Sequence, residues 1–176
     1  MKHSRFTEVK DNMEMQVTER ATIRTATQED INRVEATLRA GDRSECEIFA
    51  DWHQDIADFE DCWAIFGHGK LVGYCGVMIH PGQTALAPVR WLCFLSTQAV
   101  DGMKVSFVKD SRAVMREIVR RTPEHVTRFI SMPAAAYRGS VIWHERVLKM
   151  HRAQEVLINK HKHIVYTIDR KDVLSW

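Results

Sequence analysis

The chain has 176 residues, of which 45% are hydrophobic and 27% are charged, which is typical of one globular domain and excludes a disordered or fibrous protein. No stretch approaches the roughly 18 consecutive apolar residues of a membrane-spanning helix, and the polar start of the chain has no segment resembling a signal peptide. The four cysteines are widely spaced, so we expect buried thiols in a soluble cytoplasmic protein, not disulfides.

Charge is divided unevenly along the chain. Residues 1–88 hold nine Lys and Arg against 15 Asp and Glu, whereas residues 89–176 hold 16 against eight. This asymmetry indicates either two partners of opposite charge or two surfaces of the protein that attract each other.

The first residues differ from the rest of the chain. Residues 1–20 have weak periodicity and predict a polar N-terminal arm, so the folded domain is expected to span residues 21–176. A strand is predicted over residues 22–25, followed by a helix that Thr27 and Asp30 cap and that stops at Gly41. A second helix is predicted beyond Gly41, because four apolar residues recur at helical spacing: Ile48, Trp52, Ile56 and Phe59.

From Cys62 the hydrophobic period becomes that of strands. Residues 62–66 and 71–79 predict a hairpin, and the Pro- and Gly-containing residues 80–88 predict a loop. Residues 89–96 (VRWLCFLS) form the most apolar strand, which suits the centre of a sheet.

The last third of the chain alternates helices and strands. A loop over 97–105 leads into a helix, followed by a strand over 126–132, a helix over 140–151 and strands over 155–158 and 163–168. The first of these helices has an apolar face made of Phe107, Ser111, Val114, Met115, Ile118 and Val119. The order of elements predicts a mixed α/β fold in which helices cover a central sheet.

This order of elements resembles the GNAT (Gcn5-related N-acetyltransferase) fold over residues 21–170. Residues 23–30 (IRTATQED) are similar to the usual opening of these proteins, and residues 63–79 (WAIFGHGKLVGYCGVMI) are similar to their second and third strands. The resemblance implies a mixed, mostly antiparallel central sheet flanked by helices on both faces.

A narrower likeness lies in residues 38–46 (LRAGDRSEC), which resemble a stretch of the GNAT-like proteins of tailed bacteriophages. Some of those proteins are described as acetyltransferases and others as internal virion proteins. The likeness therefore implies either an enzyme or a phage component, located in the host cytoplasm or in the virion.

The GNAT resemblance implies acetyl-CoA as co-substrate, with its pyrophosphate held by backbone amides at the start of the third helix. The family pattern there is Gln/Arg-x-x-Gly-x-Gly/Ala, whereas residues 98–106 (QAVDGMKVS) supply one glycine and add the charge of Asp101. The residues that we expect along the cofactor are Leu95, Ser96, Thr97, Gln98, Gly102, Met103, Lys104, Val105, Ser106, Lys109 and Arg112.

Two charged stripes at helical spacing flank this region. The third helix carries Lys109, Arg112, Arg116 and Arg120, which indicate an anion site or an ordinary solvated face. No Tyr or Phe interleaves with this stripe, so nucleic acid is not favoured as a partner. The predicted second helix carries acidic residues that indicate either a site for a cationic amine or a solvated face: Glu47, Asp51, Asp55 and Asp58.

Acetyl transfer to an amine also needs an acid and a base. The resemblance implies Tyr137, before the last helix, as the acid that faces the departing thiolate. His144 is a second candidate acid, or else a histidine at the surface or at the edge of the core. Glu45 and Asp61 are candidate bases, and the segment around His161 is too short to predict a metal site.

These features predict an acyltransferase that moves an acetyl group from acetyl-CoA to an amine acceptor, which could be a protein. The alternative is a catalytically degenerate GNAT-fold bacteriophage protein that acts as a virion component or binds a host protein. Neither reading involves a membrane.

Overall fold

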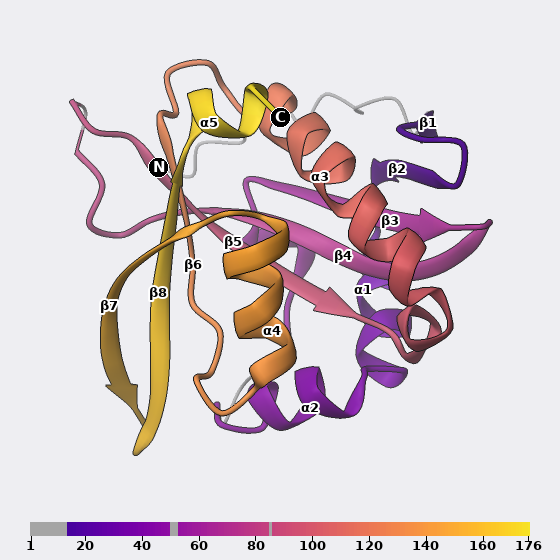
Figure 1. Cartoon of the computed structure of the whole chain (residues 1–176), viewed down its shortest axis with the longest axis horizontal. Coiled ribbons are helices and arrows are strands. Elements are labelled where there is room, and N and C mark those ends of the chain that lie inside the picture. Colours follow the sequence, from indigo (N-terminus) through magenta and orange to yellow (C-terminus); the bar gives the residue numbers. More distant parts are fainter. Residues whose placement is uncertain (1–13, 50–52, 85) are drawn as a thin grey trace, which may run out of the picture.

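A computed structural model describes residues 14–49, 53–84 and 86–176. One eight-stranded sheet runs through the molecule in the order β1-β2-β3-β4-β5-β6-β8-β7 (Figure 1). All neighbouring strands are antiparallel except β5 and β6, which are parallel. The structure thus confirms the predicted mixed, mostly antiparallel sheet with helices on both faces.

The strands are β1 (Met15–Gln16), β2 (Ala21–Thr25), β3 (Asp61–Gly67), β4 (Lys70–Ile79), β5 (Val89–Ser96), β6 (Arg128–Ser131), β7 (His151–Ile158) and β8 (His161–Asp169). The α-helices are α1 (Gln28–Ala36), α2 (Ala40–Cys46), α3 (Lys104–Arg121), α4 (Arg138–Ile142) and α5 (Arg170–Leu174). Two 3₁₀ helices, η1 (Ile56–Asp58) and η2 (Gln98–Met103), and one π-helix, η3 (Trp143–Val147), complete the set.

One face of the sheet is covered by α1. The predicted capping box is present, since the Thr27 side chain accepts the Asp30 N–H while the Asp30 carboxylate accepts the Thr27 N–H. Helix α1 then buries Ile31 and Val34 against the sheet, in a core that also contains Tyr74. Capping and an apolar stripe together explain why this helix could be predicted.

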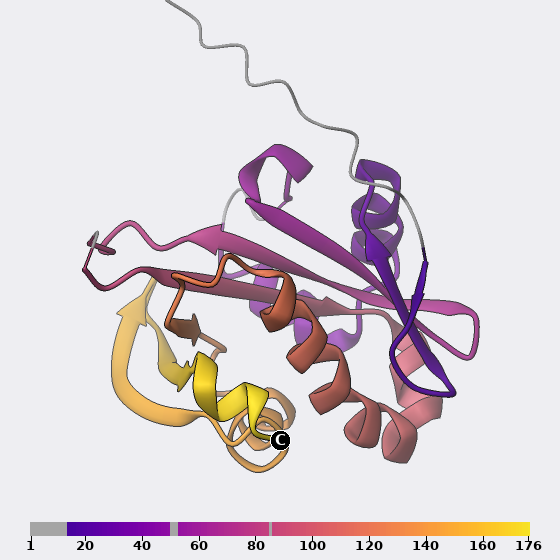
Figure 2. The same cartoon turned by 90° about the horizontal axis from the view of Figure 1, so that it is seen from above.

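The opposite face is covered by α3, α4 and α5. Figure 2 shows α1 on one side of the sheet and α3 with α5 on the other. Val114 and Ile118 of α3 pack in the same core as Val77 and Leu92 of the sheet. Burial of this apolar surface is the main force that holds α3 in place.

The parallel strands β5 and β6 diverge. They pair over only three positions, from Val89 opposite Arg128 to Trp91 opposite Ile130. Beyond Trp91, β5 continues to Ser96 paired with β4 alone, while β6 ends at Ser131 and turns away. The sheet is therefore open on one side of the second half of β5.

The second predicted helix is wrong over most of its described length. Helix α2 begins at Ala40, includes Gly41 and ends at Cys46, while Ile56 lies in a 3₁₀ turn. Trp52 and Asp51 lie outside the described residues. Asp55 and Asp58 cap that turn reciprocally, and the Gln28 side chain accepts the Ile56 N–H at 2.7 Å. The caps formed by Asp55 and Asp58 are local bonds that compete with a continuous helix, and the Gln28 bond ties the turn to α1.

Other boundaries also differ from the sequence-based expectation. Met15 and Gln16, in the predicted arm, pair with Ile23 and Thr22, whereas residues 1–13 lie outside the described part of the chain. The predicted loop over 97–105 is wound into η2. The last helix ends earlier than predicted, so that β7 begins earlier. Strand β8 extends past both of its predicted ends, and α5 was not predicted. Within the described residues, no helix is both long and apolar enough for a membrane span.

Candidate active site

A cleft of about 590 Å³ lies where β5 and β6 diverge. Its walls come from the second half of β5, the end of β6, and parts of α2, α3 and α4 with η3. The three predicted catalytic residues, Glu45, Tyr137 and His144, all line it. The fold therefore brings together side chains that are up to a hundred residues apart in the sequence. Asp61, the other candidate base, is not part of this lining.

Glu45 is the titratable group best matched to proton transfer in this cleft. It is half-buried on α2, and its carboxylate accepts the backbone N–H of Ala134 at 2.6 Å. Burial, with a smaller contribution from Asp42, raises the pKa of Glu45 to about 7. A carboxyl with this pKa changes charge near neutral pH, which suits a general base.

Asp42 fixes the position of α2. Its buried carboxylate accepts both the backbone N–H of Ser96, at 2.9 Å, and the Ser96 hydroxyl. Burial raises the pKa of Asp42 above its ordinary value. Because Ser96 ends β5, this contact ties α2 to the edge of the cleft and holds Glu45 over it. Sequence reasoning did not select Asp42, although it lies in the 38–46 stretch.

Tyr137 lies against the start of α2. The Arg39 guanidinium carbon lies 6.0 Å from the centre of its ring. A side chain at Gly41 would be impossible here, since a Cβ atom would lie 2.0 Å from Cε2 of Tyr137. Burial raises the pKa of the Tyr137 hydroxyl, which keeps its proton at neutral pH. Tyr137 is therefore available as a proton donor.

His144 is buried, with both ring nitrogens engaged. Nδ1 lies 2.7 Å from the carbonyl oxygen of Ser140, and Nε2 lies 2.9 Å from the hydroxyl of Ser131. Because a carbonyl only accepts, Nδ1 carries the proton and Nε2 accepts the Ser131 O–H. Burial lowers the pKa of His144 to about 4. This geometry favours positioning of Ser131, which sequence reasoning missed, over the predicted role of His144 as an acid.

His144 should make folding sensitive to acid. Its pKa in the folded protein lies below the ordinary value of 6.5, so the stability gained by burying the neutral ring is present above pH 6.5 and is lost as the pH falls toward 4. The full loss is on the order of 3 kcal/mol. In urea unfolding from pH 7 to pH 4, the wild type should lose more free energy of unfolding than His144→Phe, and equal losses would contradict this assignment.

The predicted cofactor residues are divided between two sides of α3. Leu95 and Ser96 line the cleft, while Met103 and Ser106 line a separate space between α3 and the sheet. Thr97 donates its hydroxyl hydrogen to the Leu71 carbonyl at 3.2 Å. The other predicted residues are placed as follows: Gln98 and Gly102 in η2, Val105 and Lys109 exposed on α3, and Lys104 at the start of α3, with its side chain outside the described atoms.

The turn before α3 is more tightly wound than the predicted amide loop. In a 3₁₀ helix each N–H bonds to the carbonyl three residues earlier, as Val100 does to Thr97 at 3.2 Å. Gly102 is exposed, and a Cβ atom there would meet no protein atom within 4 Å. Asp101 accepts a hydrogen bond from Arg39 Nε at 3.1 Å, so its charge is paired.

Two arginines of the basic stripe on α3 contact the last residue, Trp176. Arg112 donates to the Val147 carbonyl at 2.6 Å and lies 5.7 Å from the centre of the Trp176 ring. Arg116 donates to the carbonyl oxygen of Trp176. These contacts give both residues a structural role, and the predicted role of Arg112 in phosphate binding stays a prediction.

Solved structures share this architecture, although no protein-family model and no curated protein sequence matches the chain. RimL, a ribosomal L7/L12 alpha-N-protein acetyltransferase in complex with coenzyme A, is 13% identical with a TM-score of 0.62, covering 89% of this chain and 98% of its own. The aminoglycoside acetyltransferase AAC(6')-Ib in complex with coenzyme A is 18% identical with a TM-score of 0.63, covering 86% and 95%. The chain has the GNAT fold.

A third GNAT structure is an acetyl transferase from Salmonella typhimurium that modifies the N-terminal serine of L7/L12. It is 12% identical with a TM-score of 0.62 and covers 89% of this chain and 99% of its own. At such identities the likeness establishes the fold. These structures give no support to the narrower likeness to phage proteins, which stays a prediction.

Proposed function

We propose that this GNAT-fold protein is an N-acyltransferase that moves an acetyl group from acetyl-CoA to an amine. The observation that carries the proposal is the cleft between the diverging strands β5 and β6, whose lining includes both Glu45, with a pKa raised by burial to about 7, and the protonated hydroxyl of Tyr137. A base that titrates near neutral pH and a neutral acid are the two groups that aminolysis of a thioester needs.

The reaction follows from these groups. The acceptor must lose one proton to become a neutral amine, and Glu45 takes a proton either directly or through a water molecule. The amine nitrogen then forms a bond to the carbonyl carbon of the thioester, and the carbon–sulfur bond breaks with its electron pair on sulfur. Tyr137 donates a proton to the departing thiolate, and the second proton that the nitrogen loses as the amide forms returns Tyr137 to its hydroxyl form. The products are the acetylated amine and CoA.

Acetyl-CoA is expected along β5 and the start of α3. The N-cap residue of α3, Met103, makes no side-chain capping hydrogen bond, so the positive end of this long helix is not occupied by a side chain of that residue. A helix N-terminus attracts phosphate. The adjacent negative charge of Asp101 is paired with Arg39, which reduces its repulsion of a pyrophosphate.

The acceptor is expected to be cationic in its resting form. Asp42, Glu45 and Asp101 line the cleft together with the single arginine Arg39, counting only described residues. This carboxylate-rich wall favours an ammonium group, from either a protein or a small molecule. The similar structures cover both classes, since RimL acts on a ribosomal protein and AAC(6')-Ib on aminoglycosides.

A thermal-shift titration tests the proposal. At 100 times its dissociation constant, acetyl-CoA should stabilise the native state by about 2.7 kcal/mol, and so raise Tm by about 5–10 °C. Gly102→Asp should reduce this shift by repelling the pyrophosphate, whereas the neutral Gly102→Asn should not. Both variants should fold, because the position faces open space. No shift at millimolar acetyl-CoA would contradict the proposal.

One observation favours the alternative, a catalytically degenerate GNAT-fold protein that works as a phage virion component or binds a host protein. The η2 turn supplies a single glycine and is wound so that an amide such as that of Val100 bonds to the chain itself. A folded protein that shows no shift with acetyl-CoA would support this alternative.

A further inference from the structure

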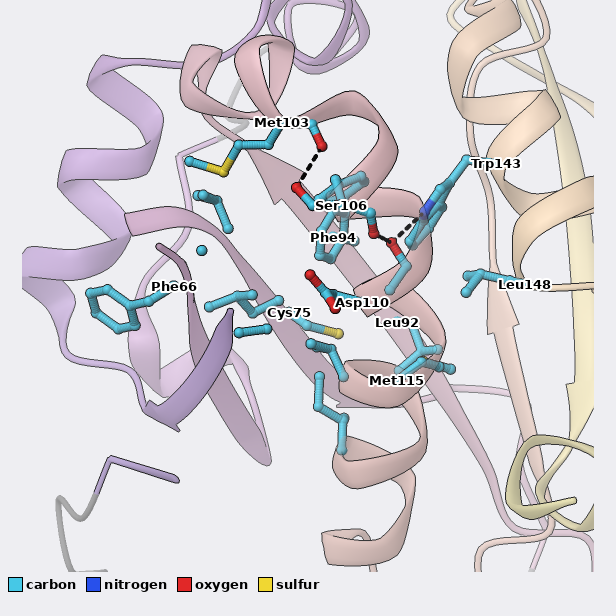
Figure 3. A pocket seen from close by; sticks show the side chains of 18 of the residues that line it. Phe66, Cys75, Leu92, Phe94, Met103, Ser106, Asp110, Met115, Trp143 and Leu148 are labelled. Atoms are coloured by element: carbon cyan, nitrogen blue, oxygen red, sulfur yellow. Dashed lines mark hydrogen bonds between the residues drawn. The ribbon is translucent and has the colours of Figure 1, made fainter. Parts of the chain in front are cut away.

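A second cavity lies between α3 and the sheet. This chamber has a volume of about 50 Å³, and Figure 3 shows the side chains that surround it. Most of its lining is apolar, and it includes Phe66, Cys75, Met103, Met115 and Leu148. The acetyl-transfer chemistry described above does not use it.

The chamber and the cleft between β5 and β6 share a wall. Six residues line both spaces: Leu92, Phe94, Phe107, Ser131, Trp143 and His144. The Phe94 ring centre lies 5.0 Å from that of Trp143 and 6.1 Å from that of Phe107, so three stacked or tilted rings form much of this wall. A group bound in the cleft thus lies next to the chamber, and it can enter only where one of these side chains turns aside.

Apart from His68, the polar side chains that line the chamber already have partners, which makes a polar occupant unfavourable. The Ser111 hydroxyl donates to the Phe107 carbonyl at 2.6 Å and accepts the Trp143 indole N–H at 3.1 Å. The Ser106 hydroxyl donates to the Met103 carbonyl. Asp110, whose carboxylate lies 3.6 Å from Arg20 Nε, also belongs to the lining. What remains for an occupant is mainly hydrocarbon surface.

We infer that the chamber receives the distal carbons of an acyl group longer than acetyl, so that the preferred donor is a short-chain acyl-CoA of about four to five carbons. The inference rests on the proposed function, since the thioester must bind in the cleft. The size follows from the chamber volume, which is about one third of the roughly 150 Å³ of an apolar cavity that holds benzene. Two or three methylene groups therefore fit.

The inference is tested by measuring kcat/KM of the wild-type protein with a series of acyl-CoA donors of increasing chain length, from acetyl to octanoyl. Each methylene buried in the chamber should raise kcat/KM about fourfold, so butyryl-CoA should exceed acetyl-CoA by about 15-fold. The value should fall again beyond about five carbons, because the chamber holds only two or three methylene groups. A series that declines from acetyl onward, or shows no dependence on length, would overturn the inference.

Val114 offers a matched set of variants, because it lines the chamber from α3. Val114→Phe should fill the space and return the butyryl-to-acetyl ratio of kcat/KM to about one or below, while Val114→Ala should move the optimum to a longer chain. Val119→Ala is the control, since Val119 is buried on the same helix but does not line the chamber. The butyryl-to-acetyl ratio of kcat/KM is measured within each variant, so it does not change if part of the protein is unfolded. An equal change in the control would contradict the assignment.

Failure of this inference can be told from failure of the proposed function. If acetyl-CoA is turned over and longer donors are no better, the chamber is not an acyl site, but the proposed acetyltransferase function is supported. If no donor is turned over, the affinities of CoA and butyryl-CoA are compared by calorimetry. Tighter binding of butyryl-CoA, by about tenfold, would support the chamber. Equal affinities would overturn it, and no binding of either would overturn both proposals.

Discussion

Glu45→Gln is expected to lower kcat/KM for acetyl transfer by about 10²–10⁴-fold, the usual contribution of a general base. The amide oxygen of Gln can still accept the Ala134 N–H that the carboxylate accepts at 2.6 Å, so the fold should be retained. Only the ability to take a proton is removed. Steady-state kinetics with acetyl-CoA and an amine acceptor at pH 8 measure the effect.

The pH dependence provides the control for Glu45. In the wild type, kcat/KM should rise with pH through an apparent pKa of about 7, as the carboxyl ionises, and Glu45→Gln should lack this step. Stability should change in the opposite direction. The pKa of Glu45 in the folded protein is raised from the ordinary 4.5. Its contribution to the free energy of unfolding is therefore complete below pH 4.5 and is lost as the pH rises to 7.

At pH 8 the variant should therefore be more stable than the wild type, by on the order of 3 kcal/mol. Chemical unfolding at pH 8 measures this difference. A Gln variant that keeps the wild-type rate and the same pH profile would exclude Glu45 as the base.

Tyr137→Phe should lower kcat by about 10²-fold with little change in KM, because only the proton donor for the departing thiolate is lost. The ring can stay over Gly41 and beneath Arg39, so the shape of the cleft is preserved. A thioester whose leaving thiol is more acidic than CoA needs less help from an acid. The loss should therefore shrink with such a donor, which a structural effect would not produce.

Gly41→Ala tests the same site with the hydroxyl retained. A Cβ atom at this position would lie 2.0 Å from Cε2 of Tyr137, so the ring must move. The variant should lose activity toward the level of Tyr137→Phe. If the Tyr137→Phe variant keeps the kcat of the wild type, Tyr137 is not the proton donor for the thiolate.

The sheet and α1 could be predicted because their signals are local. Strand periodicity, the hairpin turn before Lys70 and the capping box of Thr27 and Asp30 each lie within a few residues. The predicted continuation of the second helix failed for the same reason. Ile48, Ile56 and Phe59 have helical spacing, but short-range caps formed by Asp55 and Asp58 determine the local structure instead.

The candidate site could be predicted only in part. Glu45, Tyr137 and His144 were selected by residue type and by resemblance, and the fold places them around one cleft. Asp42 and Ser131 could not be found, because their roles come from contacts across the fold. Asp42 meets Ser96 54 residues away, and Ser131 meets His144 through a ring whose burial no local pattern reveals. The π-helix that carries His144 also has no sequence signature.

A crystal structure of the protein grown with CoA at saturating concentration tests the proposed acetyl-CoA site most directly. The pantetheine arm should lie in the cleft between β5 and β6, with the sulfur near Tyr137 and the pyrophosphate at the start of α3. CoA bound elsewhere, or an empty cleft under those conditions, would contradict it.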